Sequence, residues 1–269
     1  MTAISYDGPD GMPRGSVFGL SDDSRSLREL WLYQGAWSYY DHGLCPSGAT
    51  LIIGPGSSLA TAQVVGPADV HVVASGSDGN LWLRSTLNNH GWNWQNLGNP
   101  GWSRPRVPIL VAHSSGSSTR IHVFVPAWVG RSVHLFERYA DRGTNGYTWA
   151  SWKDWGSSPT GEPFNLTGGV TWHPRGIMNI DMFGVTDHDS NDCHGGKLAM
   201  FYWDGGAWHW SYPEIVPSGF SCEAAQTMSV AAIDSSTMMR AGVYLEDVSG
   251  GIWEYASTNG FAWGWHLMQ

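Results

Sequence analysis

Tryptophan recurs beside arginine, histidine and glutamate along this chain, often within a run of alternating apolar and polar residues, as at Trp82 and Arg84. Indole rings can stack on the C–H faces of a sugar, and charged or amide groups can bond its hydroxyls. Carbohydrate recognition is therefore the chemistry that these residue types favour. The candidate ligand-binding residues are Trp31, His71, Trp82, Arg84, Arg120, His122, Trp253 and Glu254.

A second chemistry needs only a shaped apolar cavity with one or two hydrogen-bond donors, as in a cofactor-independent cyclase or pericyclase. His173, Arg175 and His188 gather near Trp172 in the least regular part of the sequence and are the candidates for such a catalytic site. A small-molecule biosynthetic enzyme with one asymmetric aromatic pocket is thus the alternative to a glycan-binding protein. No Gly-x-Ser-x-Gly, phosphate-loop or His-Glu-x-x-His motif occurs, and we expect no cofactor.

Metal binding has one weak candidate, because Asp187, Asp189 and Asn191 have the alternating oxygen spacing of a calcium loop. The segment lacks the glycine and the distal glutamate that complete such a loop, so a solvated hairpin is the favoured interpretation and no metal is expected. The three cysteines, Cys45, Cys193 and Cys222, form no Cys-x-x-Cys pair, which gives no zinc motif.

The elements that would position these residues form an internal repeat. A Trp-x-aromatic signature begins at Trp37, Trp92, Trp208 and Trp263, with a looser copy at Trp149, so the first Trp advances by 55, 57, 59 and 55 residues. Three shorter apolar runs precede each copy, and the Asp78-Gly79 turn between two of them predicts a hairpin. The pattern predicts five units of four strands each.

A four-stranded antiparallel sheet cannot bury both faces alone, so such units must stack on one another. We therefore predict an all-β fold, a five-bladed β-propeller with four antiparallel strands per blade and with Trp rings filling the space between blades. Residues 1–269 are expected to form a single domain. The expected blades span approximately residues 1–48, 49–103, 104–160, 161–219 and 220–269.

The phrase DGNLWLRS (78–85) followed by GWNWQNLG (91–98) resembles the repeat of propeller lectins of the tectonin and bacterial fucose-lectin type. Ile252-Trp253-Glu254 resembles the repeat of fungal fucose-binding propeller lectins, whose sugar pockets use an Arg on the second strand, a Glu on the third and a neighbouring aromatic residue. The chain also resembles fungal hetero-Diels–Alderases placed on lectin-like propellers. Glu254 alone matches the Glu position, so the fucose triad is intact in no blade. The matching Arg positions hold Phe18, His71, His122, Asp181 and Gly242.

The charge and the hydropathy of the sequence limit the classes of partner that the protein is expected to bind. The net charge of −9, with 14 Lys plus Arg, argues against a nucleic-acid or anionic-membrane surface, and no apolar run approaches a membrane span. A glycan or a small hydrophobic metabolite is the expected partner, with the oligomeric state unknown. The N-terminal residues lack the pattern of a signal peptide, which is compatible with a cytoplasmic protein or with a secreted mature form.

Overall fold

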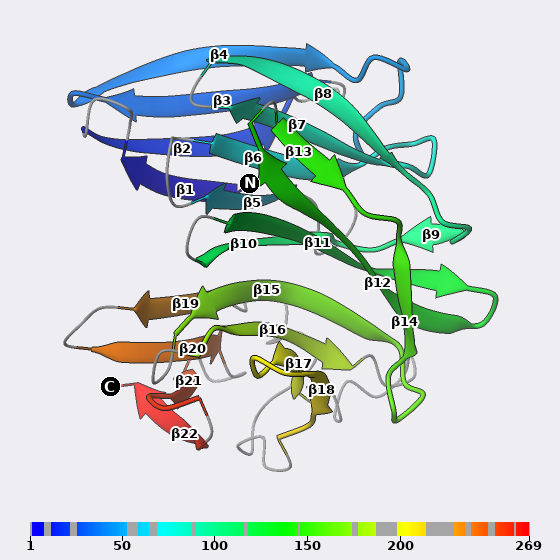
Figure 1. Cartoon of the computed structure of the whole chain (residues 1–269), viewed down its shortest axis with the longest axis vertical. Helices are drawn as coiled ribbons and strands as arrows, with labels where there is room; N and C mark the ends of the chain where they lie inside the picture. Colours follow the sequence, from blue (N-terminus) through cyan, green and yellow to red (C-terminus); the bar gives the residue numbers. More distant parts are fainter. Residues whose placement is uncertain are drawn as a thin grey trace. The chain divides into compact units, whose positions relative to one another are not determined.

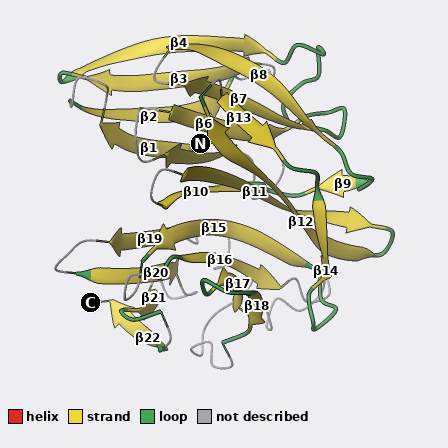
Figure 2. Ribbon diagram, in the orientation of Figure 1, coloured by secondary structure: helices red, strands yellow, loops and turns green. Residues whose placement is uncertain are grey.

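The described residues form strands and connecting turns only (Figure 2). The computed structural model describes residues 2–7, 12–21, 26–52, 59–64, 69–87, 90–115, 118–144, 146–173, 177–186, 198–213, 229–234, 238–246, 251–260 and 262–268. Within these ranges no helix is long and apolar enough to cross a membrane. The chain divides into two compact units, Met1–Gly156 and Ser157–Gln269.

The first unit contains three antiparallel sheets (Figure 1). Blade 1 is β1 (Thr2–Asp7), β2 (Pro13–Leu20), β3 (Ser26–Tyr33) and β4 (Ala36–Leu44). Blade 2 is β5 (Leu59–Val64), β6 (Asp69–Ser75), β7 (Leu81–Leu87) and β8 (His90–Gly98). Blade 3 is built on β10 (Ile109–Ser115), β11 (Ser118–Val129), β12 (Ser132–Gly143) and β13 (Gly146–Trp149).

Blade 3 departs from the predicted four strands because β11 and β12 are each 12 residues long. Their hairpin extends beyond the other strands and offers unpaired backbone groups, which two short strands cover. These are β9 (Arg104–Pro105), which pairs with β11, and β14 (Lys153–Ser157), which pairs with β12.

The second unit contains two four-stranded sheets. Blade 4 is β15 (Phe164–Trp172), β16 (Asn179–Thr186), β17 (Leu198–Trp203) and β18 (Trp208–Ser211). Blade 5 is β19 (Ser229–Asp234), β20 (Met239–Glu246), β21 (Ile252–Ser257) and β22 (Trp263–Met268). Within each of the five blades the four main strands are paired in sequence order.

The alternation of apolar residues explains why these segments pair and pack as they do. Along β6, Val70, Val72 and Ala74 face a core shared with Phe18 and Leu27 of blade 1. Val73, on the opposite face, packs into a second core with blade 3. At the turn between β6 and β7, Gly79 has a φ of 77°, so the predicted Asp-Gly hairpin is confirmed.

The repeated tryptophans lie largely where the sequence predicted. Trp92 and Trp94 pack against the core between blades 1 and 2, Trp149 against that between blades 2 and 3, and Trp263 against that between blades 4 and 5. Trp37, by contrast, is 56% exposed. The prediction of an all-β, five-bladed propeller is confirmed, whereas the single domain over residues 1–269 stays a prediction.

Candidate functional site

The face of blade 1 that packs on blade 2 carries a buried polar cluster. Ser16 donates a hydrogen bond to Glu29 Oε1 at 2.5 Å, and His42 Nε2 lies 3.0 Å from Glu29 Oε2. His42 reaches this position because a β-bulge between Leu27 and Arg28 leaves it without a register partner on β3. All three polar side chains are at most 5% exposed, so the cluster lies in the buried part of the blade 1–2 interface.

The facing side of blade 2 supplies aromatic rings and an arginine. Arg84 and Thr86 are two residues apart on β7, and their register partners on β8 are Trp94 and Trp92. The Arg84 guanidinium lies 5.3 Å from the centre of the Trp94 ring, a cation–π contact. The Trp92 ring lies 4.4 Å from that of His42, which joins the two blades. Burial lowers the pKa of Arg84, and nearby Tyr40 opposes that shift.

Four buried polar atoms at this interface have no hydrogen-bond partner within the described part of the chain. They are His42 Nδ1, Arg84 Nε, Thr86 Oγ1 and Trp94 Nε1. A buried polar group that stays unpaired costs about 1–3 kcal/mol, so native proteins rarely leave several together. The blade 1–2 interface therefore has the hydrogen-bonding capacity to hold a polar ligand or ordered water.

The interface between blades 2 and 3 also has an arginine beside a Trp ring, but this arginine is paired within the protein. Arg138 approaches the Trp149 ring to 5.7 Å, as Arg84 approaches Trp94, yet it donates to the backbone oxygens of Ala150 and Leu97 at 2.8 and 2.5 Å. Buried Asp69 accepts hydrogen bonds from Arg142 and Tyr147. Arg138 is thus a structural counterpart of Arg84.

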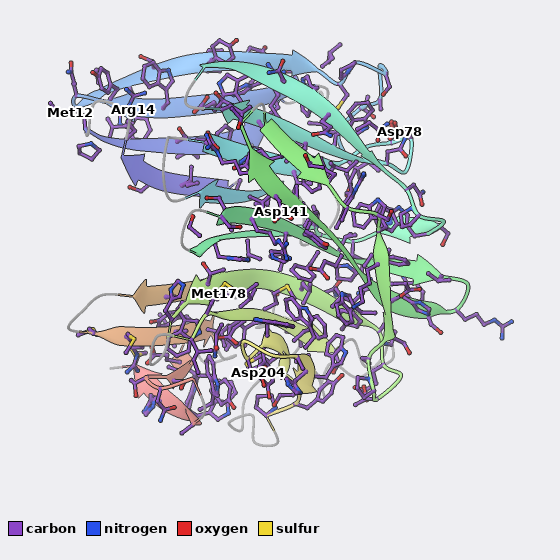
Figure 3. The ribbon with its side chains drawn as sticks, viewed as in Figure 1. Met12, Arg14, Asp78, Asp141, Met178 and Asp204 are labelled. Atoms are coloured by element: carbon purple, nitrogen blue, oxygen red, sulfur yellow. The ribbon has the colours of Figure 1, made fainter. Side chains whose placement is uncertain are left out.

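Blades 1, 3 and 5 repeat an arginine and a glutamate whose equivalence appears only when the strands are paired. Phe18, Phe124 and Tyr244 on the second strands are paired in register with Glu29, Glu137 and Glu254 on the third. An arginine precedes each aromatic residue by four positions, in the phrases RGSVF (14–18), RIHVF (120–124) and RAGVY (240–244). Arg14, the first of these arginines, is labelled in Figure 3. Glu29 and Glu137 therefore occupy the same third-strand position in their blades as Glu254, which the sequence had matched alone.

In blade 5 this arginine and glutamate form a closed ion pair. Arg240 donates through Nε and Nη2 to both carboxylate oxygens of Glu254, and Tyr244 donates its hydroxyl to Oε1 at 2.9 Å. The hydrogen bonds from Arg240 hold the pKa of Glu254 below its usual range. In blade 3 the arginine binds elsewhere, because Arg120 pairs with Asp141 at 2.7 Å.

The predicted ligand-binding residues fall into different environments. Arg84 lies at the blade 1–2 interface, and Trp31 is half-buried on β3, stacked on Tyr33. Trp82 is 5% exposed and donates to Asp78, as a core residue would. His71 is fully buried on the opposite face of blade 2 from Arg84.

The remaining predicted residues divide between blades 3 and 5. Arg120 and His122 lie two residues apart on one face of β11. Trp253 and Glu254 are consecutive on β21, so the pleat directs them to opposite faces of blade 5. The eight residues therefore do not converge on one place.

The alternative enzyme site and the calcium-like loop fall mainly outside the described residues. Arg175, His188, Asp187, Asp189 and Asn191 all lie there, whereas His173 follows β15 and is partly exposed. The neighbouring Trp172 is buried and donates to Asp181 Oδ2 at 2.5 Å. Burial raises the pKa of Asp181 to about 7, which is typical of a carboxyl group in an apolar environment.

Comparison with solved structures supports the architecture. The chain aligns over 99% of its length with 71% of an arginine-to-alanine triple mutant of AofleA from Arthrobotrys oligospora, at 15% identity and a TM-score of 0.62. Unmutated AofleA gives 16% identity and a TM-score of 0.60, with 95% of this chain and 68% of that chain covered. This chain shares its fold with AofleA.

Other neighbours are named as lectins. BP39L lectin from Burkholderia pseudomallei aligns with 99% of this chain and 83% of its own, at 18% identity and a TM-score of 0.49. No family model matches the sequence, and no curated protein does so either.

Proposed function

We propose that this propeller binds carbohydrate, with the blade 1–2 interface as its principal site. The observation that carries the proposal is the set of four unpaired polar atoms from His42, Arg84, Thr86 and Trp94 beside two partly exposed indole rings. A sugar offers several hydroxyls and an apolar face at once, which is the combination that these residues can satisfy. Lectins among the structural neighbours agree with this chemistry.

Each side chain has a distinct role in the proposal. The Trp92 and Trp94 rings provide stacking area, and the Trp94 N–H and the Arg84 guanidinium donate to ring or hydroxyl oxygens. Thr86 can donate and accept through its hydroxyl, and His42 is held in place by Glu29. The preformed cluster on blade 1 lowers the ordering cost of binding, because Glu29 and Ser16 fix the imidazole before a ligand arrives.

The decisive experiment is a glycan array followed by calorimetric titration of the strongest glycan, with Arg84→Ala compared against Arg138→Ala. Charge-assisted hydrogen bonds contribute about 1.5–3 kcal/mol, so Arg84→Ala should weaken binding by at least about tenfold. Arg138→Ala removes an arginine from an equivalent Trp contact and should lower the unfolding temperature while leaving glycan affinity unchanged.

Two outcomes would contradict the proposal in different ways. If the folded wild-type protein binds no glycan, carbohydrate binding is contradicted and the alternative, small-molecule chemistry near His173, is favoured. Glycan binding that survives Arg84→Ala but is lost in Arg240→Ala would keep the function and place the site in blade 5.

A further inference from the structure

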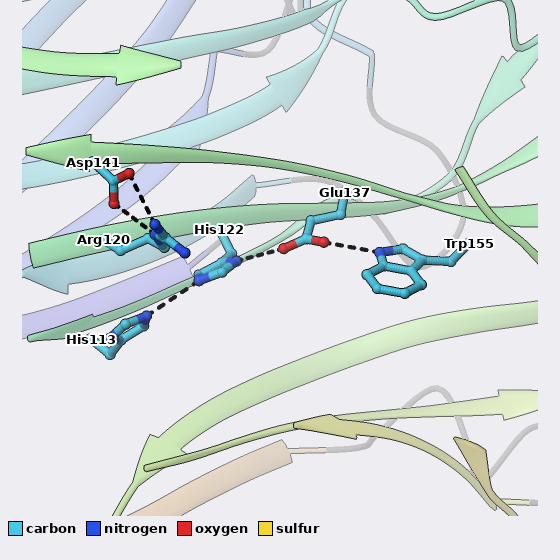
Figure 4. A network of polar contacts seen from close by, with 6 residues as sticks. All are labelled: His113, Arg120, His122, Glu137, Asp141 and Trp155. Carbon is cyan, nitrogen blue, oxygen red and sulfur yellow. Dashed lines mark hydrogen bonds and ion pairs between the residues drawn. The ribbon is translucent and has the colours of Figure 1, made fainter. Parts of the chain in front are cut away.

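Two imidazoles face one another on blade 3. His113 on β10 and His122 on β11 project from the same face of neighbouring strands, and their Nε2 atoms are 3.3 Å apart (Figure 4). The ring centroids are 5.4 Å apart and the ring planes are inclined by 28°. His122 is 5% exposed, and His113 is partly exposed. The pair is therefore preformed, with access through His113.

A carboxylate fixes the orientation and the tautomer of His122. Its Nδ1 lies 2.7 Å from Glu137 Oε1, and the other carboxylate oxygen accepts a hydrogen bond from Trp155 Nε1 at 2.9 Å (Figure 4). Because a carboxylate accepts, the His122 proton is at Nδ1 and the lone pair is at Nε2, directed at His113. A hydrogen-bonded carboxylate behind an imidazole is the arrangement that orients metal-ligating histidines.

The nitrogen separation matches a shared metal ion. Two nitrogens that each lie about 2.0–2.1 Å from a tetrahedral Zn²⁺ are about 3.4 Å apart, close to the separation of the two Nε2 atoms. We propose that His113 and His122 bind a transition-metal dication such as Zn²⁺ through Nε2, with Glu137 and Trp155 as the supporting hydrogen-bond partners. The metal takes the place of the imidazole–imidazole hydrogen bond, and His113 then carries its proton at Nδ1.

The local charge favours a cation. Arg120 and Asp141, adjacent to the pair, neutralise one another at 2.7 Å, which leaves the Glu137 carboxylate to compensate the positive charge of the metal. Among the described residues no group of three or more His, Cys, Asp and Glu side chains is placed to hold a metal. The proposal therefore assigns these two histidines as the protein ligands, with water completing the coordination of the metal.

Another histidine–carboxylate pair in blade 3 provides the control. His134 Nδ1 lies 2.9 Å from Asp154 Oδ2, as His122 lies near Glu137, but no second imidazole appears among its described ring contacts. If a carboxylate-bound histidine were enough to capture zinc, His134 would capture it as well. The proposal requires the second histidine.

The test is a calorimetric titration of the chelator-treated full chain with Zn²⁺ alone. The wild type should show a Zn²⁺ site that His113→Gln and His122→Gln both abolish and that His134→Gln retains. Trp155→Phe, which keeps an aromatic ring but removes the donor to Glu137, should weaken Zn²⁺ binding by about 10- to 100-fold. Substitution with Co²⁺ should give an absorption spectrum that is lost in the same two variants.

His113→Gln keeps the test valid if the more buried His122 variant fails to fold, since His113 is partly exposed. Equal zinc uptake by the wild type and His113→Gln would overturn the proposal, as would a loss in His134→Gln as large as that in His113→Gln. None of these measurements depends on glycan binding.

Discussion

His71 shows what burial does to a single titratable side chain in this fold. The ring is fully buried, and neither nitrogen has a hydrogen-bond partner within the described residues. Its nearest ring contact is Tyr147, edge-on at 4.8 Å. Burial lowers the pKa of His71 to about 4, with Asp69 raising it and Arg142 lowering it to smaller extents. The ring is therefore neutral in the folded protein at pH 7.

Because His71 is buried as a neutral ring, we predict that the free energy of unfolding falls in acid. His71→Leu should remove this contribution to the fall. The folded-state pKa lies below the unfolded value of about 6.5, so the unfolded chain binds more protons between pH 6.5 and about 4. The stabilisation by neutral His71 is complete above pH 6.5 and is lost as pH falls through this window. At pH 5 the penalty is about 2 kcal/mol.

Urea unfolding at pH 7.5 and pH 5 is the measurement. At pH 7.5 the free energy of unfolding of His71→Leu should be at least that of the wild type. When the pH falls to 5, the difference between the variant and the wild type should grow by about 2 kcal/mol in favour of the variant. His134→Leu, which replaces a partly exposed histidine, should not reproduce the difference. Identical acid slopes for the wild type and His71→Leu would show that His71 is charged or hydrated in the fold.

At the scale of strands, the sequence predicts the apolar pattern well and the polar pattern poorly. Alternation and the Trp spacing locate the strands, because each follows from the two-residue period of a pleated sheet. Glu29, Glu137 and Glu254 follow their paired aromatic residues by 11, 13 and 10 positions. Hairpins of unequal length shift the spacing, so the glutamates align only when strands are paired in three dimensions.

Bulges limit sequence prediction further. His42 reaches Glu29 only because of the irregularity in β4, and no residue pattern marks that irregularity. The Nε1 of Trp82 turns back to Asp78 in the adjacent turn, a contact that the strand period does not predict. The face on which Arg84 lies, in contrast, follows directly from the strand period.

Blade 4 provides a test of strand packing at Gly184 on β16. The residue pairs with Leu166, next to a register irregularity in β15, and an added Cβ would collide with the backbone oxygen of Asn165. Backbone cannot move as a flexible side chain can, so Gly184→Ala should lower the free energy of unfolding by about 1–3 kcal/mol or more. Denaturant titration measures this loss.

Gly206 is the control in the same blade. A Cβ there would meet only Asp204 Oδ1, at 3.5 Å, so Gly206→Ala should change stability by less than about 0.5 kcal/mol. If both substitutions were equally neutral, the close approach of β15 to Gly184 would be refuted.

For the whole molecule, the blades are alike in backbone but unequal in their polar residues. Blades 1, 3 and 5 carry the third-strand glutamate, while the corresponding positions in blades 2 and 4 are the apolar Leu83 and Met200. Each glutamate also has a different partner, namely His42, His122 or Arg240. Such differences argue against a set of equivalent ligand sites.

The number of bound sugars per chain follows from this inequality. At the blade 1–2 interface four unpaired polar atoms, from His42, Arg84, Thr86 and Trp94, lie beside partly exposed indole rings, so we expect one glycan per chain in calorimetric titration. A monovalent chain gains no avidity from linked sites, so affinity should not rise when glycan density on an array surface increases. A stoichiometry near three, reduced by one in Arg84→Ala, would instead mean that blades 1, 3 and 5 each bind sugar through their glutamates.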